Sequence, residues 1–356
     1  MTPREIARHR LANLRIAAST ARDPADVVTA LGAMQAQDYA GALWAIGLRL
    51  ANATQADIER AIAARTIVRT WPMRGTLHFV PAADVRWMLE LLTPRILSGS
   101  AKRQLALELD AAVFARCRAV FLRELQDGRQ LTREAMLASL ERAGIPAGPQ
   151  RGYHILWRLA QEQLLCFASR EGKQPTFALL DEWAPAGRRL SRDEALAELA
   201  RRYFTSHGPA TLADFVWWSG LKVTDARAAI DFVASELAAE IIDGKTHWLP
   251  PSSVPAAPGH AELLPGFDEY LLGYQDRRAV LDPAHAEKIV PGGNGVFRPM
   301  LVLDGKISGV WKSASGKSSV KITPSPFQPL KKSAARALAL SAARYGKFLG
   351  LATRLA

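Results

Sequence analysis

The sequence contains few cysteines and no long hydrophobic run. Its two cysteines, Cys117 and Cys166, lie in apolar periodic segments without a C-x-x-C spacing, which predicts buried thiols in a reducing compartment. No apolar run reaches the ~18 residues of a membrane span, and the first residues lack the apolar core of a signal peptide. We therefore expect a cytoplasmic protein with no membrane partner.

Motifs for metal and nucleotide chemistry are also missing. There is no H-E-x-x-H, no Cys/His pair at zinc spacing, no G-x-S-x-G, and no G-x-G-x-x-G after a strand. Gly316-Lys317-Ser318 ends like a phosphate-binding loop, but Trp311 stands where that motif needs its first glycine. We therefore expect neither a metal nor another cofactor.

Acidic residues are absent from the last part of the chain. Residues 305–356 contain ten Lys or Arg and no Asp or Glu, and the formal net charge of the whole chain is +12. This distribution predicts a polyanionic partner. A solubilising basic face, or an Arg-rich composition of no functional meaning, is the alternative.

With 356 residues, the chain is long enough for several modules. In the first, Asp23 and Pro24 predict the start of a helix with an apolar stripe, and helices over residues 39–50 and 54–65 follow. Strands over 67–71 and 76–80 close the pattern. Three helices and a hairpin are typical of a winged helix.

The same order of helices and hairpin recurs twice, and a proline-rich linker then leads to strand-like runs and a basic helix over residues 331–348. We predict an α+β fold of tandem winged-helix (helix-turn-helix) modules with a C-terminal β-rich domain. The predicted domains are residues 1–105, 106–188, 189–252 and 253–356.

Two carboxamides flank one small residue in the segment Met-Gln-Ala-Gln-Asp-Tyr at residues 34–39. On a regular helix, Gln35 and Gln37 would point about 200° apart, whereas in an extended chain they share a face. Both amides can therefore serve one site only if the preceding helix ends near Gln35. A solvated helix end is the simpler interpretation of the pair taken alone.

Basic residues in the predicted wings and helices are candidates for DNA contacts. Arg69 and Arg74 belong to the first hairpin, and a wing places its tip against the DNA backbone. Lys222 and Arg227 lie where the recognition helix of the third module would begin. Trp71, in the same hairpin as the two arginines, is more often a core residue than a base-stacking one.

Four separated motifs together resemble the AlkZ-type winged-helix DNA glycosylases. They are Gln-Ala-Gln at residues 35–37, RTWPMRGTLH at 69–78, LPGFDEYLLGY at 264–274 and GNGVFRP at 293–299. The resemblance covers nearly the whole chain. It implies tandem winged helices, a C-terminal β-rich domain and a concave basic surface for duplex DNA.

The resemblance also implies a function and a site. It implies a glycosylase that excises N7-alkylated purines and unhooks interstrand crosslinks, often for self-resistance to an alkylating natural product. Gln35 and Gln37 would be catalytic, with Ala36 as an unusually small middle residue. From the second and fourth motifs we add His78 and Arg298 to the expected DNA-binding residues. The expected protein is nucleoid-associated and monomeric.

Other functions stay open on the sequence. A non-enzymatic winged-helix regulator would explain everything except the glutamine pair, and an RNA-binding protein is a third hypothesis, although no stacking motif of the RRM type is present. Within the site, Asp38 is a competitor for the water-orienting role, because a carboxylate is a stronger base than an amide.

Overall fold

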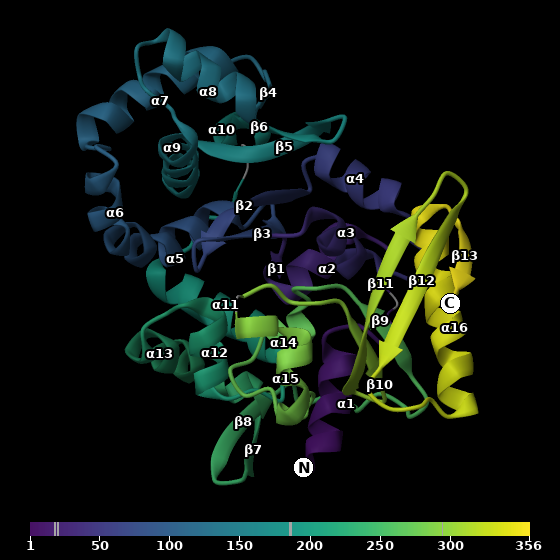
Figure 1. Cartoon of the computed structure of the whole chain (residues 1–356). Coiled ribbons are helices and arrows are strands. Elements are labelled where there is room, and N and C mark those ends of the chain that lie inside the picture. Colours follow the sequence, from purple (N-terminus) through teal and green to yellow (C-terminus); the bar gives the residue numbers. More distant parts are fainter. Residues whose placement is uncertain (18, 20, 185–186, 294) are drawn as a thin grey trace. The chain divides into compact units, whose positions relative to one another are not determined.

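The computed structural model describes residues 1–17, 19, 21–184, 187–293 and 295–356 (Figure 1). Internal contacts divide the chain into two units, residues 59–195 and residues 1–58 with 196–356. We call them the middle unit and the terminal unit. Both combine helices with antiparallel hairpins, so the expected α+β class is confirmed.

The middle unit consists of helices around one sheet. Within this unit the strands follow the order β3-β2-β5-β6-β4. The two hairpins of this sheet meet where Arg69 of β2 pairs with Phe167 of β5. The helix α4 (Gln55–Ala63) leads into the unit from the terminal one. The other elements are β2 (Ile67–Met73), β3 (Thr76–Pro81), α5 (Val85–Gly99), α6 (Ala101–Ala106), α7 (Ala111–Leu125), β4 (Leu131–Thr132), α8 (Arg133–Arg142), α9 (Pro149–Gln161), β5 (Leu165–Glu171), β6 (Gln174–Leu179) and α10 (Leu180–Trp183).

Aromatic side chains from both hairpins form the core of the middle unit. The ring of Trp71 lies 5.0 Å from that of Phe167, which lies 4.5 Å from Phe177. These rings pack with aliphatic side chains of the surrounding helices. Trp71 is therefore a core residue, as its position in the strand indicated.

The terminal unit holds both ends of the chain. Its helix α2 starts at a strong cap, because Asp23 accepts a hydrogen bond from the N–H of Ala25 and Pro24 occupies the first helical position. The elements are α1 (Pro3–Asn13), α2 (Pro24–Leu31), β1 (Met34–Gln35), α3 (Tyr39–Gly47), α11 (Arg192–His207), α12 (Leu212–Ser219), α13 (Val223–Val233), η1 (Ala234–Glu236), β7 (Ala238–Ile242), β8 (Lys245–Leu249), β9 (Ala261–Leu264), α14 (Glu269–Leu272), η2 (Pro283–His285), α15 (Ala286–Ile289), η3 (Pro291–Gly293), β10 (Met300–Leu303), β11 (Lys306–Ser315), β12 (Ser319–Pro326), α16 (Lys332–Leu349) and β13 (Ala352–Leu355).

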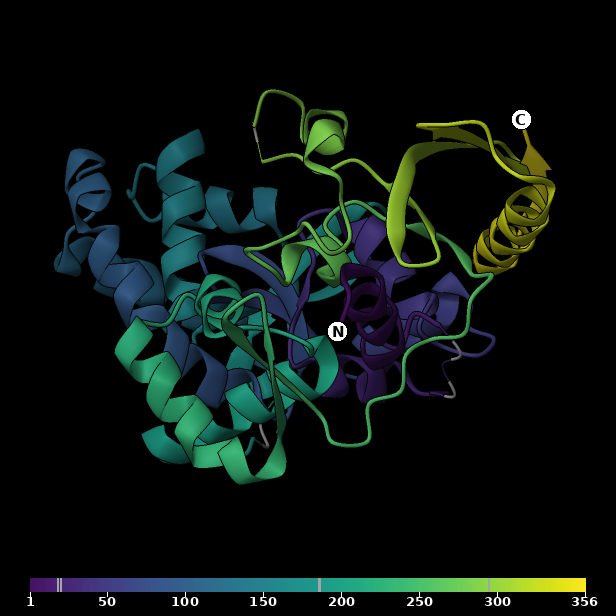
Figure 2. The same cartoon turned by 90° about the horizontal axis from the view of Figure 1, so that it is seen from below.

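A five-stranded sheet ends the terminal unit. Its order is β13-β12-β11-β10-β9, and α16 packs against β9 and β13 (Figures 1 and 2). A side chain at Gly47 would collide with the ring of Phe348, because the position of its Cβ would lie 2.3 Å from that ring. The glycine therefore allows α3 and α16 to approach closely. The expected C-terminal strands and basic helix are present in this part of the chain.

The expected helices and hairpins occur in the predicted order, but the two units do not follow the predicted domain limits. The helices α2 and α3 belong to the terminal unit, whereas the hairpin β2–β3 that would complete the first winged helix belongs to the middle unit. The reason is the pairing of β2 with β5, which joins this hairpin to the next one. The division into four domains stays a prediction.

Both cysteines are buried free thiols, as expected. Burial raises the pKa of Cys117 to about 11 and also raises the pKa of Cys166. Among the helices that the structure describes, none is long and apolar enough to span a membrane.

Candidate active site

The helix before the glutamine pair ends early enough for both amides to face one side. The helix α2 stops at Leu31, and Gly32 follows with a φ of +78°, a conformation that glycine tolerates best. The short strand β1 comes next, and α3 starts only at Tyr39. The segment of Gln35 and Gln37 is therefore not helical. This ending of the helix is the one that the sequence requires if both amides are to serve one site.

Burial alternates along this segment. The side chains of Met34 and Ala36 are almost fully buried, Gln35 is partly buried and Gln37 is exposed. Alternate residues of an extended chain point to the same side. Both glutamines are thus more accessible than Met34 and Ala36, and the methyl group of Ala36 anchors the segment in the core.

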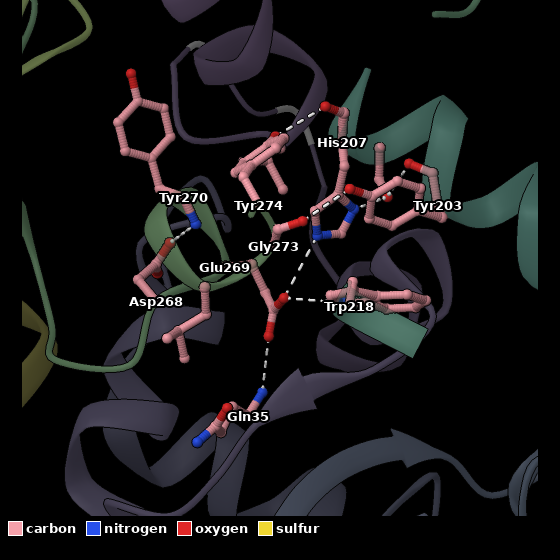
Figure 3. Close-up of polar contacts among 12 residues, drawn as sticks. Gln35, Tyr203, His207, Trp218, Asp268, Glu269, Tyr270, Gly273 and Tyr274 are labelled. Carbon is pink, nitrogen blue, oxygen red and sulfur yellow. Dashed lines mark hydrogen bonds and ion pairs between the residues drawn. The ribbon is translucent and has the colours of Figure 1, made fainter. Parts of the chain in front are cut away.

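A buried carboxylate holds the backbone of this segment (Figure 3). The N–H of Gln35 donates to Oε1 of Glu269 at 3.0 Å, and the indole N–H of Trp218 donates to Oε2 at 2.9 Å. The Nε2 atom of His207 lies 3.4 Å from the same Oε2. Burial lowers the pKa of His207, which favours its neutral form.

The segment that carries Glu269 is itself fixed by buried hydrogen bonds. Tyr203 donates its hydroxyl proton to the carbonyl of Gly273 at 2.7 Å, and Tyr274 donates to the carbonyl of His207 at 2.8 Å. A Cβ at position 273 would lie 2.5 Å from the His207 ring, so only glycine permits this approach. These hydrogen bonds join the segment of α14 to α11, and Glu269 of α14 in turn holds the backbone of Gln35.

Two of the residues expected to bind DNA are buried in the middle unit. Arg69 is 9% exposed and its guanidinium lies 4.8 Å from the ring centre of Phe167. His78 is fully buried, and its Nδ1 lies 3.0 Å from the carbonyl of Thr76. This burial favours structural roles for Arg69 and His78, and a part in DNA binding stays an untested prediction for both.

Arg74 remains a candidate for a DNA contact. It occupies the turn between β2 and β3 with a φ of 52°, and its side chain is partly buried. Its Nη2 lies 3.3 Å from Nε2 of His78. The histidine therefore helps to orient the arginine at the tip of the hairpin.

The remaining predicted residues are exposed. Lys222 is the N-cap residue of α13 and Arg227 lies on that helix, as expected for the start of a recognition helix. Arg298 is exposed next to β10, in a motif whose Asn294 lies outside the described residues. The structure thus leaves all three available for contacts with a polyanion, and their role stays a prediction.

Sequence reasoning missed Glu269, Trp218 and His207. For Glu269 the signals were the motif at residues 264–274, which contains it, and the pair Asp268-Glu269 inside an apolar run, where two carboxylates need buried partners. Among the described residues, no group of three or more His, Cys, Asp or Glu side chains is arranged to hold a metal ion.

The fold agrees with that of a known DNA glycosylase. The structure matches the Streptomyces sahachiroi DNA glycosylase AlkZ with a TM-score of 0.77, covering 100% of both chains at 24% sequence identity. The architecture is thus one that a DNA glycosylase has.

Sequence comparison shows the family. Residues 28–348 match the family model of DNA glycosylase AlkZ-like. The chain is also 28% identical over 330 residues to the interstrand DNA cross-link repair glycosylase of Streptomyces sahachiroi, covering 85% of this chain and 84% of that protein. The chain belongs to the AlkZ-like DNA glycosylase family and is therefore an enzyme that hydrolyses N-glycosyl bonds. This assignment favours the glycosylase hypothesis over a non-enzymatic regulator.

Proposed function

We propose that this glycosylase excises purines alkylated at N7 from duplex DNA, including purines that are crosslinked to the opposite strand. The observation that carries the proposal is the site itself, in which two neutral carboxamides, Gln35 and Gln37, flank the buried Ala36. The curated relative, an interstrand cross-link repair glycosylase, supports crosslinked DNA as one substrate.

Neutral amides suit a substrate that is already activated. Alkylation at N7 gives the purine a positive charge, so the base leaves as a neutral molecule and needs no general acid. The enzyme must then stabilise an oxocarbenium-like sugar and place a water molecule, as in other glycoside cleavages. The side-chain oxygens of Gln35 and Gln37 can orient water and offer partial negative charge.

The same argument restricts the substrate. A carboxamide is neither a strong general acid nor a strong general base. An unmodified purine leaves as an anion and would need such assistance, so it should react very slowly. Each tenfold difference in rate corresponds to about 1.4 kcal/mol of activation free energy. Much of the selectivity would therefore come from the lability of the leaving group.

A crosslinked purine places a further demand on the site. Glycosylases commonly rotate the target nucleotide out of the duplex. A purine tethered to the other strand cannot leave the stack freely. We therefore propose that the glutamines approach the sugar at the duplex, with limited displacement of the base.

The proposal is tested with purified protein and three duplexes of one sequence, which contain N7-methylguanine, an N7-linked interstrand crosslink, or unmodified guanine. We expect the first duplex to release free N7-methylguanine and the second to yield separated strands. The unmodified duplex should give no product. Release of neither modified base under conditions where the protein binds duplex DNA would refute the proposed substrates.

A further inference from the structure

We propose that Glu269 is a positioning residue for the glutamine segment. In this role the buried carboxylate fixes the backbone of Gln35 and thereby the direction in which the carboxamides of Gln35 and Gln37 point. The inference rests on the proposed function of these two glutamines.

The two oxygens of Glu269 face different parts of the terminal unit (Figure 3). Oε1 accepts the hydrogen bond from the N–H of Gln35, whereas Oε2 accepts the one from the Trp218 indole on α12. The carboxylate is 1% exposed. It therefore connects the glutamine segment to α12, and water does not compete for these hydrogen bonds.

Both oxygens of Glu269 act as acceptors, as in an ionised carboxylate. A hydrogen bond from a backbone N–H to an ionised carboxylate is shorter and stronger than one to a neutral acceptor. In a buried place, this strength sets the position of the peptide between Met34 and Gln35. The neighbouring Ala36 is fully buried and adds the apolar half of the anchor.

Small changes of position at this peptide are expected to affect chemistry more than binding. Misplacing a catalytic group by ~1 Å can cost ~10²-fold in rate. The predicted phosphate contacts, at Arg74, Lys222 and Arg227, lie outside this segment, so the affinity for the duplex should change little. This separation of rate from affinity distinguishes positioning from a general loss of structure.

The test uses two of the hydrogen-bond donors at Glu269, the N–H of Gln35 and the indole N–H of Trp218, and keeps His207, whose Nε2 lies 3.4 Å from Oε2, in every variant. In Glu269→Gln, the single amide oxygen can accept from Gln35 or from Trp218, and the NH₂ group then faces the other donor. Adding Trp218→Phe removes the indole N–H, so the amide oxygen becomes available to Gln35. A positioning role predicts that the second substitution restores activity, whereas a purely structural role predicts two additive losses.

We expect Glu269→Gln to lower the single-turnover rate on N7-methylguanine duplex by about 10- to 30-fold, with the Kd for DNA within about threefold. The double variant should regain at least about fivefold of that rate. Trp218→Phe alone completes the cycle. All rates are measured well below the melting temperature of each variant. If Glu269→Gln does not fold, Glu269→Asp, which shortens the side chain by one methylene, is used instead and should also lower the rate.

Asp214→Asn is the matched control. Asp214 is a buried carboxylate in the same unit that accepts hydrogen bonds from the N–H groups of Thr211 and Gln275 and does not hold the glutamine segment. Its substitution should lower the melting temperature and leave the rate unchanged at saturating DNA.

The outcomes separate the two proposals. Wild-type protein that neither releases N7-methylguanine nor unhooks the crosslinked duplex would refute the proposed function and this inference with it. An active wild type with an inactive Gln35→Ala variant, but an unchanged rate in Glu269→Gln and Glu269→Asp, would refute only the role of Glu269. A double variant slower than Glu269→Gln would also overturn it.

Discussion

The guanidinium of Arg49 donates to both carboxylate oxygens of Asp268 in the interior of the terminal unit. The Nη1–Oδ2 distance is 2.9 Å and the Nη2–Oδ1 distance is 2.8 Å, with both side chains fully buried. Arg49 also donates to the carbonyls of Leu14 and Ala45, each at 2.7 Å. This ion pair connects the end of α3 to the residue before Glu269.

Removing one member of this pair should destabilise the fold strongly. In Asp268→Asn or Arg49→Met, the remaining partner is a buried group without its counter-charge, which typically costs about 3–5 kcal/mol. Denaturant unfolding of each variant measures the loss. A loss below about 1 kcal/mol would mean that water or another group replaces the missing partner.

The pH dependence of stability should contain a contribution from Glu262. Burial raises the pKa of this carboxyl group to about 7, although the charge of Arg344 opposes the shift. As the pH rises above about 4.5, the unfolded chain loses this proton while the folded protein keeps it, so stability falls until about pH 7 and then stays lower. Glu262→Gln should therefore stabilise the protein at pH 8, by up to about 3 kcal/mol, and have little effect at pH 4.

Thermal unfolding of wild type and Glu262→Gln at several pH values checks this sign. Glu194→Gln is the opposite control, because hydrogen bonds from Ser191 lower the pKa of the exposed Glu194. That variant should be less stable than wild type at neutral pH and equal to it at low pH. Equal effects of Glu262→Gln at pH 4 and pH 8 would contradict the raised pKa.

Local signals in the sequence were sufficient to predict most helices and hairpins. Caps such as Asp23 and turn residues such as Gly244 act within a few residues, so their effect can be read from the chain. The four-residue strand β13 was missed, because its pairing with β12 depends on where α16 ends. The limits of the units were not predictable either, since the pairing of β2 with β5 is a long-range contact.

The candidate site was predictable only in part. Residue types and spacing identified Gln35 and Gln37, but Glu269 lies 234 residues from Gln35 and 51 from Trp218. The burial of Arg69 escaped prediction for a different reason. All seven residues of β2 are buried, so the strand has no polar face that would mark an arginine as exposed.

Arg74 and Arg69 should respond differently to substitution. Charge reversal at Arg74 should weaken binding to all duplexes and reduce the slope of log K against log salt by about 0.9 for one lost phosphate contact. Similar changes are expected at the exposed Lys222 and Arg227. Arg69→Met should instead lower thermal stability and leave the salt slope of the folded protein unchanged. A binding-site selection that finds strong sequence preference would contradict phosphate contacts as the main source of affinity.

The glutamines should act on rate more than on binding. Gln35→Ala and Gln37→Ala should each lower excision of N7-methylguanine by at least about tenfold and keep DNA affinity within a few-fold. Single-turnover assays and binding titrations separate the two quantities. Asp38→Asn is the critical comparison, because Asp38 is exposed next to Gln37. An inactive Asp38→Asn with an active Gln37→Ala would move the water-orienting role to the carboxylate.

The products should be a free modified base and an intact abasic site. The cationic purine leaves as a neutral molecule, so its departure requires no acid, redox partner or added metal, and activity should persist in EDTA. The segment of residues 34–39 contains no lysine that could form a Schiff base with the sugar, so water is the expected nucleophile. Analysis of the DNA strand after reaction, before and after alkali, shows whether the backbone is still continuous. Trapping of a protein–DNA adduct by borohydride would show a lyase mechanism, and loss of activity on chelation would show a required metal ion.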